Sequence, residues 1–561
     1  MNRLVELTFK NRGYSSEFLR EMECAEHGDL KDIDRLAVRL KEIHDEGRHI
    51  TVLPDFDMDG ISAGTVAYAG LSELGFDVSL FIPDPSKGYG FNEDTIKELL
   101  KKHPRTQTIL TCDTGISCYE GINYCKDRGI EILVTDHHIQ EAVSEADIIV
   151  DPCRMDDGYE HKGICGAFVI QQVLQFYADT FCDTHMRDQM QRLRLFAGIG
   201  TVSDIMPVLY ENRQLIRDSI GLARAVYSNG TVHGVRNFEG CTAYKTPFWG
   251  MFAVLKVCAE HGIIKKEDDI NEEFYGFYLA PMFNSVKRMD GDLRRAFLVF
   301  FGNEREENAE YLYQLNELRK KTVEEEMENL LSSVQPYAPF IYISKAKPGI
   351  LGLLATRLVE RNKMPVFVMN DMTGRMKGPF CGSGRSPEWY PCFSRQIGRF
   401  DIAGHECAFG CRLPDNSALV ETFRFLKEDV PAMLSNADIK EAVPDFIIST
   451  DWKADTGIDI ALFDEYLSEM ENYHPFGKGF PQPDVVFRFN DSDAVYGWKS
   501  LGMDKQHLKI GFASGFDLYL WNQGDKISLK DNGEMHEARG KLFISEYAGK
   551  RGICFKGVLA R

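Results

Sequence analysis

Four short apolar segments in the first third of the chain each run directly into a polar motif, and this repetition restricts the fold more than any other feature. The segments are HITVLPDFDMDG (residues 49–60), TILTCDTG (108–115), EILVTDHH (131–138) and DIIVDP (147–152), with helical stretches after the first three. Strands that alternate with helices predict a parallel α/β sheet with right-handed connections. Ligands of open α/β sheets bind at the carboxyl ends of the strands, which is where these motifs would lie.

The length of 561 residues predicts about three or four domains. We expect an α/β protein with a parallel-sheet catalytic domain, a long linker helix, a second α/β domain and a small C-terminal β-barrel of the OB type, because five or so short strands follow one another near the end. The expected segments are a helical segment packed on the catalytic domain (1–48), the catalytic domain (49–305), the linker helix (306–335), the second α/β domain (336–430) and the barrel (443–561).

The composition is that of an ordinary globular protein and excludes several classes. No apolar run approaches the ~18 residues of a membrane span, and the first residues have no signal-peptide core. The 14 cysteines follow no regular framework, so we expect reduced thiols in a cytoplasmic protein. The 85 acidic and 65 basic residues give a net charge of −20. Such a chain can bind nucleic acid only if basic residues gather in one groove or if bound metals neutralise clustered carboxylates.

The first polar motif places three carboxylates two residues apart. Asp55, Asp57 and Asp59 would point to one side of an extended strand end, and carboxylates that close together call for cations. A solvated acidic turn is the alternative. An EF-hand calcium loop is disfavoured, because an apolar strand precedes the motif and because Val66 stands at loop position twelve, where glutamate is needed.

The other motifs are weak alone and informative together. Taken alone, Asp113 at a strand end is typical of a helix cap, and Asp204 after the apolar LFAGIG is typical of an N-cap. The adjacent His137 and His138 are equally compatible with metal binding and with no metal role. Taken together, the motifs supply more ligands than one ion uses, so we infer two metals that share a carboxylate, an arrangement that serves phosphoryl hydrolysis. Oxygen and imidazole ligands favour manganese or magnesium over zinc. The expected ligands are Asp57, Asp59, Asp113, His137 and Asp204.

These motifs, in this order, resemble those of the DHH phosphoesterase superfamily. More narrowly, the chain resembles the RecJ-like family of single-strand-specific 5′→3′ DNA exonucleases, and the resemblance covers nearly its whole length. Further segments that carry it are GICGAFV (163–169), GTVSD (200–204), APMFNSVKRM (280–289), KPGILGLLATRLVE (347–360), GSGRS (382–386), AGHECAFG (403–410) and HPFGKGFPQP (474–483).

The resemblance implies roles for individual residues. It places the five expected ligands on the metal ligands of the family, with Asp113 as the bridge. It implies that Asp136 orients the histidines and that His138 contacts the scissile phosphate. The implied catalytic residues are therefore Asp136 and His138 together with the five metal ligands. The implied substrate-binding residues are Asn284, Arg288, Ser383, Gly384, Arg385 and His405.

The GSGRS motif supports phosphate binding on chemical grounds as well. Its glycines let the backbone approach an anion, and Arg385 offers a planar fork for two hydrogen bonds. A plain turn is the alternative. Zinc at His405, Cys407 and Cys411 is disfavoured because no second ligand pair lies nearby in the sequence.

The chain departs from the family pattern at three positions. Pro54 and Ala403 stand where glycine is usual, and Lys347 stands where histidine is usual. Lysine keeps a positive donor but cannot act as a neutral imidazole, which puts the role of that position in doubt.

The expected function is therefore that of a metal-dependent exonuclease that cuts single-stranded DNA 5′→3′ into 5′ mononucleotides, in recombination and repair. The alternatives are a DHH phosphodiesterase for short oligonucleotides or cyclic dinucleotides, and a non-catalytic nucleic-acid-binding scaffold, which would be expected to have lost motif carboxylates. Expected partners are single-stranded DNA and, as candidates, a single-strand-binding protein or a helicase. We expect a monomer that does not contact a membrane.

Overall fold

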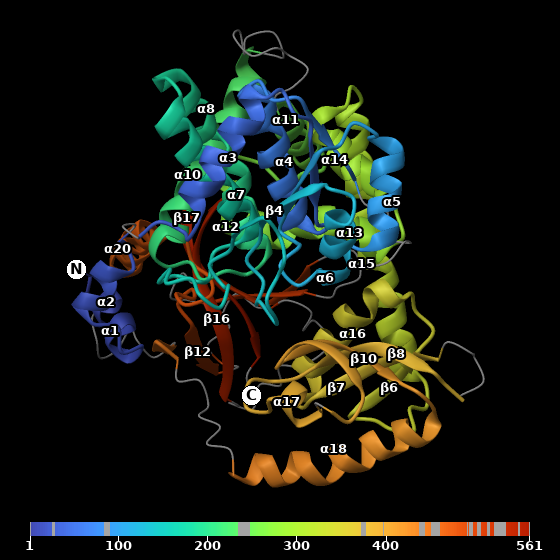
Figure 1. Ribbon diagram of the computed structural model, residues 1–561. Helices are drawn as coiled ribbons and strands as arrows, with labels where there is room; N and C mark the ends of the chain where they lie inside the picture. The colour runs from blue at the N-terminus through green and yellow to red at the C-terminus, as the bar shows by residue number, and fades with distance from the viewer. Residues whose placement is uncertain are drawn as a thin grey trace. The chain divides into compact units, whose positions relative to one another are not determined.

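The computed structural model divides the chain into two compact units (Figure 1). The α/β unit comprises His27–Met206 and Asp218–Ile439, and the β unit comprises Met1–Glu26, Pro207–Arg217 and Lys440–Arg561. The structure describes residues 2–24, 28–82, 90–233, 247–371, 377–396, 398–436, 444–449, 460–490, 492, 498–501, 507–512, 517–520, 535–547 and 550–559.

The first sheet of the α/β unit is parallel, as the sequence predicts. Its five strands follow the order β2-β1-β3-β4-β5. Pairing joins the last residue of β1 to that of β3, and the last residue of β3 to that of β4, so the three polar motifs begin at the same level of one sheet edge. The strands are β1 (Ile50–Pro54), β2 (Val78–Leu80), β3 (Thr108–Cys112), β4 (Glu131–Thr135) and β5 (Ile148–Val150).

Helices rich in small residues pack around this sheet. Helix α4 packs against α7 and α9, and α3 packs against α7 and β5. The segment LFAGIGTVS lies in helix α9, so Asp204 follows a helix and not a strand. The helices are α3 (Ile33–Asp45), α4 (Met58–Glu73), α5 (Glu93–Lys102), α6 (Tyr119–Lys126), α7 (Gly166–Phe181), α8 (Thr184–Arg192) and α9 (Arg194–Ser203).

A helical layer follows and ends in the long helix that the sequence predicts. Helix α15 (Arg305–Ser332) packs against α11, α13 and α14 and also against α16 and β6 of the second α/β domain, so it is part of the core and not only a solvated spacer. The layer contains α10 (Tyr210–His233), α11 (Phe248–Glu260), η2 (Glu267–Asp269), α12 (Glu272–Phe274), the π-helix η3 (Tyr275–Leu279), α13 (Ala280–Arg288) and α14 (Leu293–Phe301).

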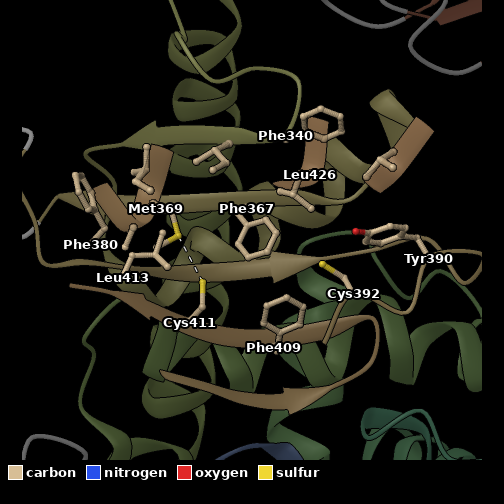
Figure 2. Close-up of a cluster of buried hydrophobic side chains, with 14 residues drawn as sticks. Phe340, Phe367, Met369, Phe380, Tyr390, Cys392, Phe409, Cys411, Leu413 and Leu426 are labelled. Carbon is tan, nitrogen blue, oxygen red and sulfur yellow. Dashed lines mark hydrogen bonds between the residues drawn. The ribbon is translucent and has the colours of Figure 1, made fainter. Parts of the chain in front are cut away.

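The second α/β domain is a mixed sheet of order β6-β7-β8-β10-β9, in which only the pair β6 and β7 is parallel. Alternate residues of its strands face opposite sides: Val366 and Val368 pack with α16, whereas Phe367 and Met369 pack with α18 and Phe409 (Figures 1 and 2). The elements are β6 (Ile341–Ser344), α16 (Pro348–Asn362), β7 (Val366–Asp371), β8 (Phe380–Arg385), α17 (Cys392–Gln396), β9 (Asp401–His405), β10 (Ala408–Leu413) and α18 (Asn416–Asn436).

The β unit is built on a seven-stranded sheet of order β11-β12-β16-β17-β15-β14-β13. The pairings of its described strands do not include one that closes the sheet, so closure into a barrel stays a prediction. The elements are α1 (Arg3–Asn11), α2 (Ser16–Glu21), β11 (Phe446–Ser449), α20 (Ile460–Met470), η4 (Glu471–Tyr473), β12 (Val485–Asn490), β13 (Trp498–Leu501), β14 (His507–Gly511), β15 (Asp517–Leu520), β16 (Met535–Tyr547) and β17 (Lys550–Leu559).

The N-terminal segment does not group as one piece. Helix α1 packs against α20 and β11, and Arg12 binds both carboxylate oxygens of Asp445 at 2.7 Å. Helix α3 instead lies in the α/β unit. Residues 1–26 therefore belong with the C-terminal segment. The sequence analysis instead groups residues 1–48 with the catalytic domain.

None of the helices in the described ranges has both the length and the apolar character that crossing a membrane requires.

A buried arginine joins three chain segments of the β unit. Arg213 has a fully buried side chain that donates to the carbonyl oxygens of Pro475 at 2.8 Å and of Tyr473, and to Glu23 at 2.6 Å. Replacing it leaves buried acceptors without donors. We expect Arg213→Met to lower the free energy of unfolding of the β unit by about 3 kcal/mol.

Urea unfolding followed by circular dichroism measures this change. The control is Arg20→Met, an exposed arginine of α2, which should change the free energy by less than about 0.5 kcal/mol. Equal unfolding midpoints for the two variants would contradict the assignment.

Candidate metal centre

The acidic motif lies at the start of a helix and not on an extended strand. Helix α4 begins at Met58, with Asp57 as its N-cap, whose Oδ1 accepts a hydrogen bond from the N–H of Gly60 at 3.0 Å. Asp59 is in the first turn, and both Asp55 and Asp59 are buried. The three carboxylates thus gather at the positive end of a helix dipole, which favours negative charge.

A second helix start holds Asp59. The N–H groups of Gly166 and Ala167, in the first turn of α7, donate to its two carboxylate oxygens at 2.8 and 3.1 Å. A Cβ at Gly200 of α9 would lie 2.2 Å from Oδ1 of Asp59, so only glycine lets α9 approach this closely. Burial nevertheless raises the pKa of Asp59.

Asp113 follows β3 in a left-handed conformation. Its φ is 61°, which aspartate tolerates better than most residues, and its N–H donates to the carbonyl of Thr135 at 2.9 Å. Burial, followed by repulsion from Asp59 and Asp57, raises its pKa well above the ordinary value. A Cβ at Gly166 would lie 2.5 Å from the Asp113 side chain, so this site also depends on a glycine.

His137 lies at the centre of the cluster. Its Nε2 is 3.1 Å from Oδ1 of Asp113, 3.7 Å from Oδ2 of Asp59 and 3.7 Å from Oδ2 of Asp204. Asp204 is the C-cap of α9, so the N-cap considered for it from the sequence is wrong. The structure brings together carboxylates from three separate segments around one imidazole.

Asp136 is buried and makes hydrogen bonds to both residues of the histidine pair. Its Oδ1 accepts from the N–H of His137 at 2.8 Å and from Nδ1 of His138 at 2.7 Å, and its Oδ2 accepts from the N–H of Ile116 at 2.9 Å. Burial opposes ionisation of Asp136, but the bond and charge of His138 outweigh it and lower the pKa. The same hydrogen bond raises the pKa of His138 to about 9.

The donor set fits two divalent cations. Oδ1 of Asp113 is buried and accepts no hydrogen bond from the described residues, and Asp113 and His137 each belong to two of the donor groups. Burial raises the pKa of the nearby Cys165 thiol, which leaves oxygen and nitrogen donors of the kind that manganese and magnesium use. The groups whose donor atoms lie within 4.8 Å of one another are Asp59, His137 and Asp204; Asp55, Asp57 and Asp113; and Asp113, His137 and His138.

Three residues near the centre received no individual role in the sequence analysis. Asp55 belongs to a donor group, although only its neighbours were assigned as ligands. Asp151 after β5 is buried, and burial followed by repulsion from Asp136 raises its pKa to about 8. Nζ of Lys287 lies 3.7 Å from the centroid of the Phe56 ring. The strand-end position in DIIVDP was the signal for Asp151, whereas nothing local marked Lys287.

Helix α13 connects the centre to the second α/β domain. Oδ1 of Asn284 accepts a hydrogen bond from the N–H of Met58, at the start of α4, at 2.9 Å. Arg288 is half-buried, and burial lowers its pKa. Its guanidinium is attracted by Asp57 and repelled by Arg385, so it is influenced by charges of both the acidic centre and the second domain.

The GSGRS motif forms the end of strand β8 and not a turn. Nη1 of Arg385 donates to Oγ of Ser383 at 2.7 Å and to the carbonyl of Gly384 at 2.8 Å. A Cβ at Gly384 would lie 2.5 Å from the Phe409 ring, so this glycine serves packing in the sheet. His405 ends β9, and its side chain lies outside the described part of the chain.

Two glycines bring α16 against these arginines. A Cβ at Gly352 would lie 2.9 Å from Nη2 of Arg385, and one at Gly349 would lie 2.5 Å from the carbonyl of Arg288. The first turns of α16 therefore approach both arginines closely.

The three departures from the family pattern are accommodated locally. Pro54 is the last residue of β1. A Cβ added at Gly64 of α4 would lie 2.7 Å from the proline side chain, so the proline ring packs against α4. Lys347 precedes α16 and pairs with Asp290 at 3.0 Å. Ala403 lies within β9 opposite Gly410.

Comparisons with known proteins agree with this geometry. Residues 49–198 match the model of the DHH family, N-terminal domain, and residues 455–556 match the RecJ OB domain. The single-stranded-DNA-specific exonuclease RecJ of Bacillus subtilis is 26% identical over 93% of this chain and 62% of its own length. RecJ of Salmonella typhimurium is 26% identical over 98% of this chain and 94% of its own length.

A solved structure shows the same fold. RecJ of Thermus thermophilus in complex with Mn²⁺ matches with a TM-score of 0.74 and 20% identity, over all of this chain and 76% of that one. The chain is similar to RecJ over nearly its whole length, and one of its segments matches the DHH family model. The fold class predicted from the sequence is thereby confirmed. The RecJ-like chain spans only about three fifths of the B. subtilis relative.

The close approach of Gly200 to Asp59 gives a test of the centre. We expect Gly200→Ala to weaken Mn²⁺ binding at least about tenfold, because the added Cβ displaces a ligand carboxylate. Isothermal titration calorimetry with Mn²⁺ measures the affinity.

The matched control is Gly221→Ala on α10, where a Cβ would meet nothing within 4 Å. That variant should bind Mn²⁺ as the unchanged protein does and gain up to about 1 kcal/mol of stability. Unchanged affinity in Gly200→Ala would show that Asp59 does not hold the ion.

Proposed function

We propose that the RecJ-like chain is a metal-dependent exonuclease that hydrolyses single-stranded DNA 5′→3′ and releases 5′ mononucleotides. The observation that carries this proposal is that Arg288 interacts electrostatically with both Asp57 of the acidic centre and Arg385 of the second domain, and that helix α16 approaches Arg288 and Arg385 closely. The proposed cleavage site and the proposed phosphate-binding site would therefore be neighbours within the α/β unit. The relatives named single-stranded-DNA-specific exonuclease RecJ support the choice of substrate.

Two Mn²⁺ or Mg²⁺ ions are the proposed cofactors, as in the metal complexes of T. thermophilus RecJ. When bound, such ions activate water and neutralise charge on the phosphate. Asp113 is the proposed bridge because its carboxylate is shared between donor groups and is repelled by the other carboxylates. The proposed ligands are Asp57, Asp59, Asp113, His137 and Asp204, with Asp55 as a further candidate.

His138 is the proposed donor to the scissile phosphate. Asp136 accepts its Nδ1–H, which leaves Nε2 directed away from the carboxylate, and a pKa of about 9 keeps the ring protonated at neutral pH. A cationic N–H donor stabilises the negative charge that the phosphate gains during in-line attack. Asn284, which binds the N–H of Met58, would hold the acidic loop in place while the strand moves.

The second domain is the proposed anchor for the 5′ end. Ser383, Arg385 and Arg288 present a hydroxyl and two guanidinium groups, and forked guanidinium groups suit phosphate oxygens. Gly384 and His405 belong to the same proposed pocket. An anchor one nucleotide from the cleavage site would set both the polarity and the product length.

The cellular location, the pathway, the oligomeric state and the protein partners are further predictions. The described cysteines are free thiols, which suits a reducing cytoplasm. A role in recombination and repair, a monomeric state, and a partnership with a single-strand-binding protein or a helicase rest on the family resemblance.

Asp113 gives the most direct test of the catalytic assignment. We expect Asp113→Asn to lower kcat on single-stranded DNA by at least about 10²-fold, because a ligand to both ions loses its charge. In EDTA the thermal midpoint should equal or exceed that of the unchanged protein, because the substitution removes a buried repelled carboxylate.

The control is Asp188→Asn, an exposed residue of α8 that should keep full activity. Manganese-dependent cleavage by Asp113→Asn at the unchanged rate would refute the assignment, and a lowered midpoint in EDTA would point to misfolding.

Polarity is tested with one long single strand carrying a label at either end. With Mn²⁺ or Mg²⁺, a 5′ label should leave at once as a mononucleotide, whereas a 3′-labelled strand should shorten step by step. The matched substrate is a cyclic dinucleotide. Turnover of the dinucleotide without degradation of the long strand would replace the proposed function by that of a small-molecule phosphodiesterase.

A further inference from the structure

One face of helix α13 covers the acidic motif. Asn284, Lys287 and Arg288 are spaced three and four residues apart, so their side chains lie along one side of the helix. Asn284 accepts a hydrogen bond from the N–H of Met58 at 2.9 Å, and Nζ of Lys287 lies 3.7 Å from the centroid of the Phe56 ring. This side of α13 therefore contacts the segment that joins β1 to α4 and carries the first carboxylates.

The charged end of Lys287 is placed in an unusual way for a lysine. Lysine ordinarily packs its aliphatic stem on apolar surface and keeps its ammonium group in water. Lys287 is exposed as a residue, but its ammonium group lies over the ring of Phe56, which is buried. The face of an aromatic ring attracts a cation, and more strongly where water is excluded. The ammonium group is therefore held against the acidic motif and not released into solvent.

Two carboxylates attract the same ammonium group. Asp55 and Asp57 stand on either side of Phe56 in the sequence, and both attract Lys287. Desolvation is the largest effect and lowers the pKa of Lys287, whereas the two carboxylates act in the opposite direction and Arg288 adds a smaller lowering. The acidic motif is thus partly neutralised by a positive charge that the protein itself supplies.

The two donor groups of the centre differ in their surroundings. Lys287 acts on two members of the first group, whereas the main charges that act on Asp59, in the second group, are those of His137 and Asp57. A divalent ion in the first group would share its carboxylates with the ammonium group, and like charges close together weaken binding. The first group is Asp55, Asp57 and Asp113, and the second group is Asp59, His137 and Asp204.

We infer that Lys287 is a built-in cation that competes with the ion of the first group, so that this ion binds more weakly than the ion of the second group. This inference rests on the proposed function, because it takes the centre to hold two ions. Lys287 thereby sets the affinity of one ion without being a ligand of either. The second group would keep its ion at low concentrations of free Mn²⁺, and the first group would fill only at higher ones.

Calorimetric titration of the metal-free protein with Mn²⁺ tests this competition. We expect two binding events of different affinity in the unchanged protein. Lys287→Met removes the charge and keeps most of the length of the side chain, so it should strengthen the weaker event at least about fivefold and leave the stronger event within about twofold. Lys287→Arg keeps the charge and can also lie over an aromatic ring, so it should bind both ions as the unchanged protein does.

Thermal unfolding gives a second readout. In EDTA, Lys287→Met should have a lower midpoint than the unchanged protein, because Asp55 and Asp57 lose a counter-charge. With saturating Mn²⁺ the difference should shrink, because the variant binds the ion of the first group more tightly. A substitution that only damages packing would lower the midpoint in both conditions and would weaken Mn²⁺ binding instead of strengthening it.

The matched control is Lys97→Met on α5. Nζ of Lys97 lies 2.8 Å from Oε1 of Glu93 and 5.7 Å from the centroid of the Tyr124 ring, so this exposed lysine also joins a carboxylate to an aromatic ring. Neither Lys97 nor Glu93 belongs to a donor group of the centre. The control variant should therefore bind both ions with unchanged affinity.

The outcomes separate this inference from the proposed function. Unchanged affinities in Lys287→Met, a weakened event in that variant, or two equal affinities in the unchanged protein would each overturn the role of Lys287 and leave the metal centre in place. Absence of Mn²⁺ binding in the unchanged protein would overturn the centre and the inference together. If the affinities change as expected while the unchanged protein degrades no single strand with Mn²⁺, the nuclease assignment alone is wrong.

Discussion

Repulsion between buried carboxylates is the constraint on which this site depends. Asp59 and Asp113 are both buried, and each raises the free energy of ionising the other. The fold offsets part of this cost, because α4 and α7 direct their N-termini at Asp57 and Asp59 and because the imidazole of His137 lies 3.1 Å from Asp113. The remaining charge is the physical reason for inferring bound cations, since carboxylates that pack this closely are stable only when paired or coordinated.

The surrounding backbone is shaped by the same crowding. Side chains at Gly166 and Gly200 would overlap Asp113 and Asp59, and Asp113 itself takes a left-handed conformation that costs free energy. Gly60 faces the backbone of Asp55 in the same way. Three helices can therefore converge on the carboxylates only through residues without side chains. The centre is preorganised by packing, so the candidate ligands would need little rearrangement to bind ions.

The sequence predicted those parts of the site that local patterns determine. Residues that follow apolar strands, such as Asp113 and His137, could be placed at one sheet edge because parallel strands end in line. Asp204 could be named but not placed, since the apolar glycine-rich LFAGIG has no period that separates a buried helix from a strand. The grouping of residues 1–26 with the C-terminal segment could not be predicted either. It depends on contacts such as that of Arg12 with Asp445, which no local pattern encodes.

Local pairing, more than total charge, decides whether an acidic protein can bind a polyanion. The net charge of the chain is −20, and pairs such as Lys320 with Glu317 contribute little field beyond their own contact. Arg288, Arg319 and Arg385 have no carboxylate oxygen within 4.0 Å among the described residues, and the apolar cluster around Met289, Val323 and Ile350 packs the helices beside them. Burial makes their repulsion expensive when the pocket is empty. A phosphate bound near them would exchange that repulsion for attraction, and the negative charge of the rest of the chain would limit binding elsewhere on the surface.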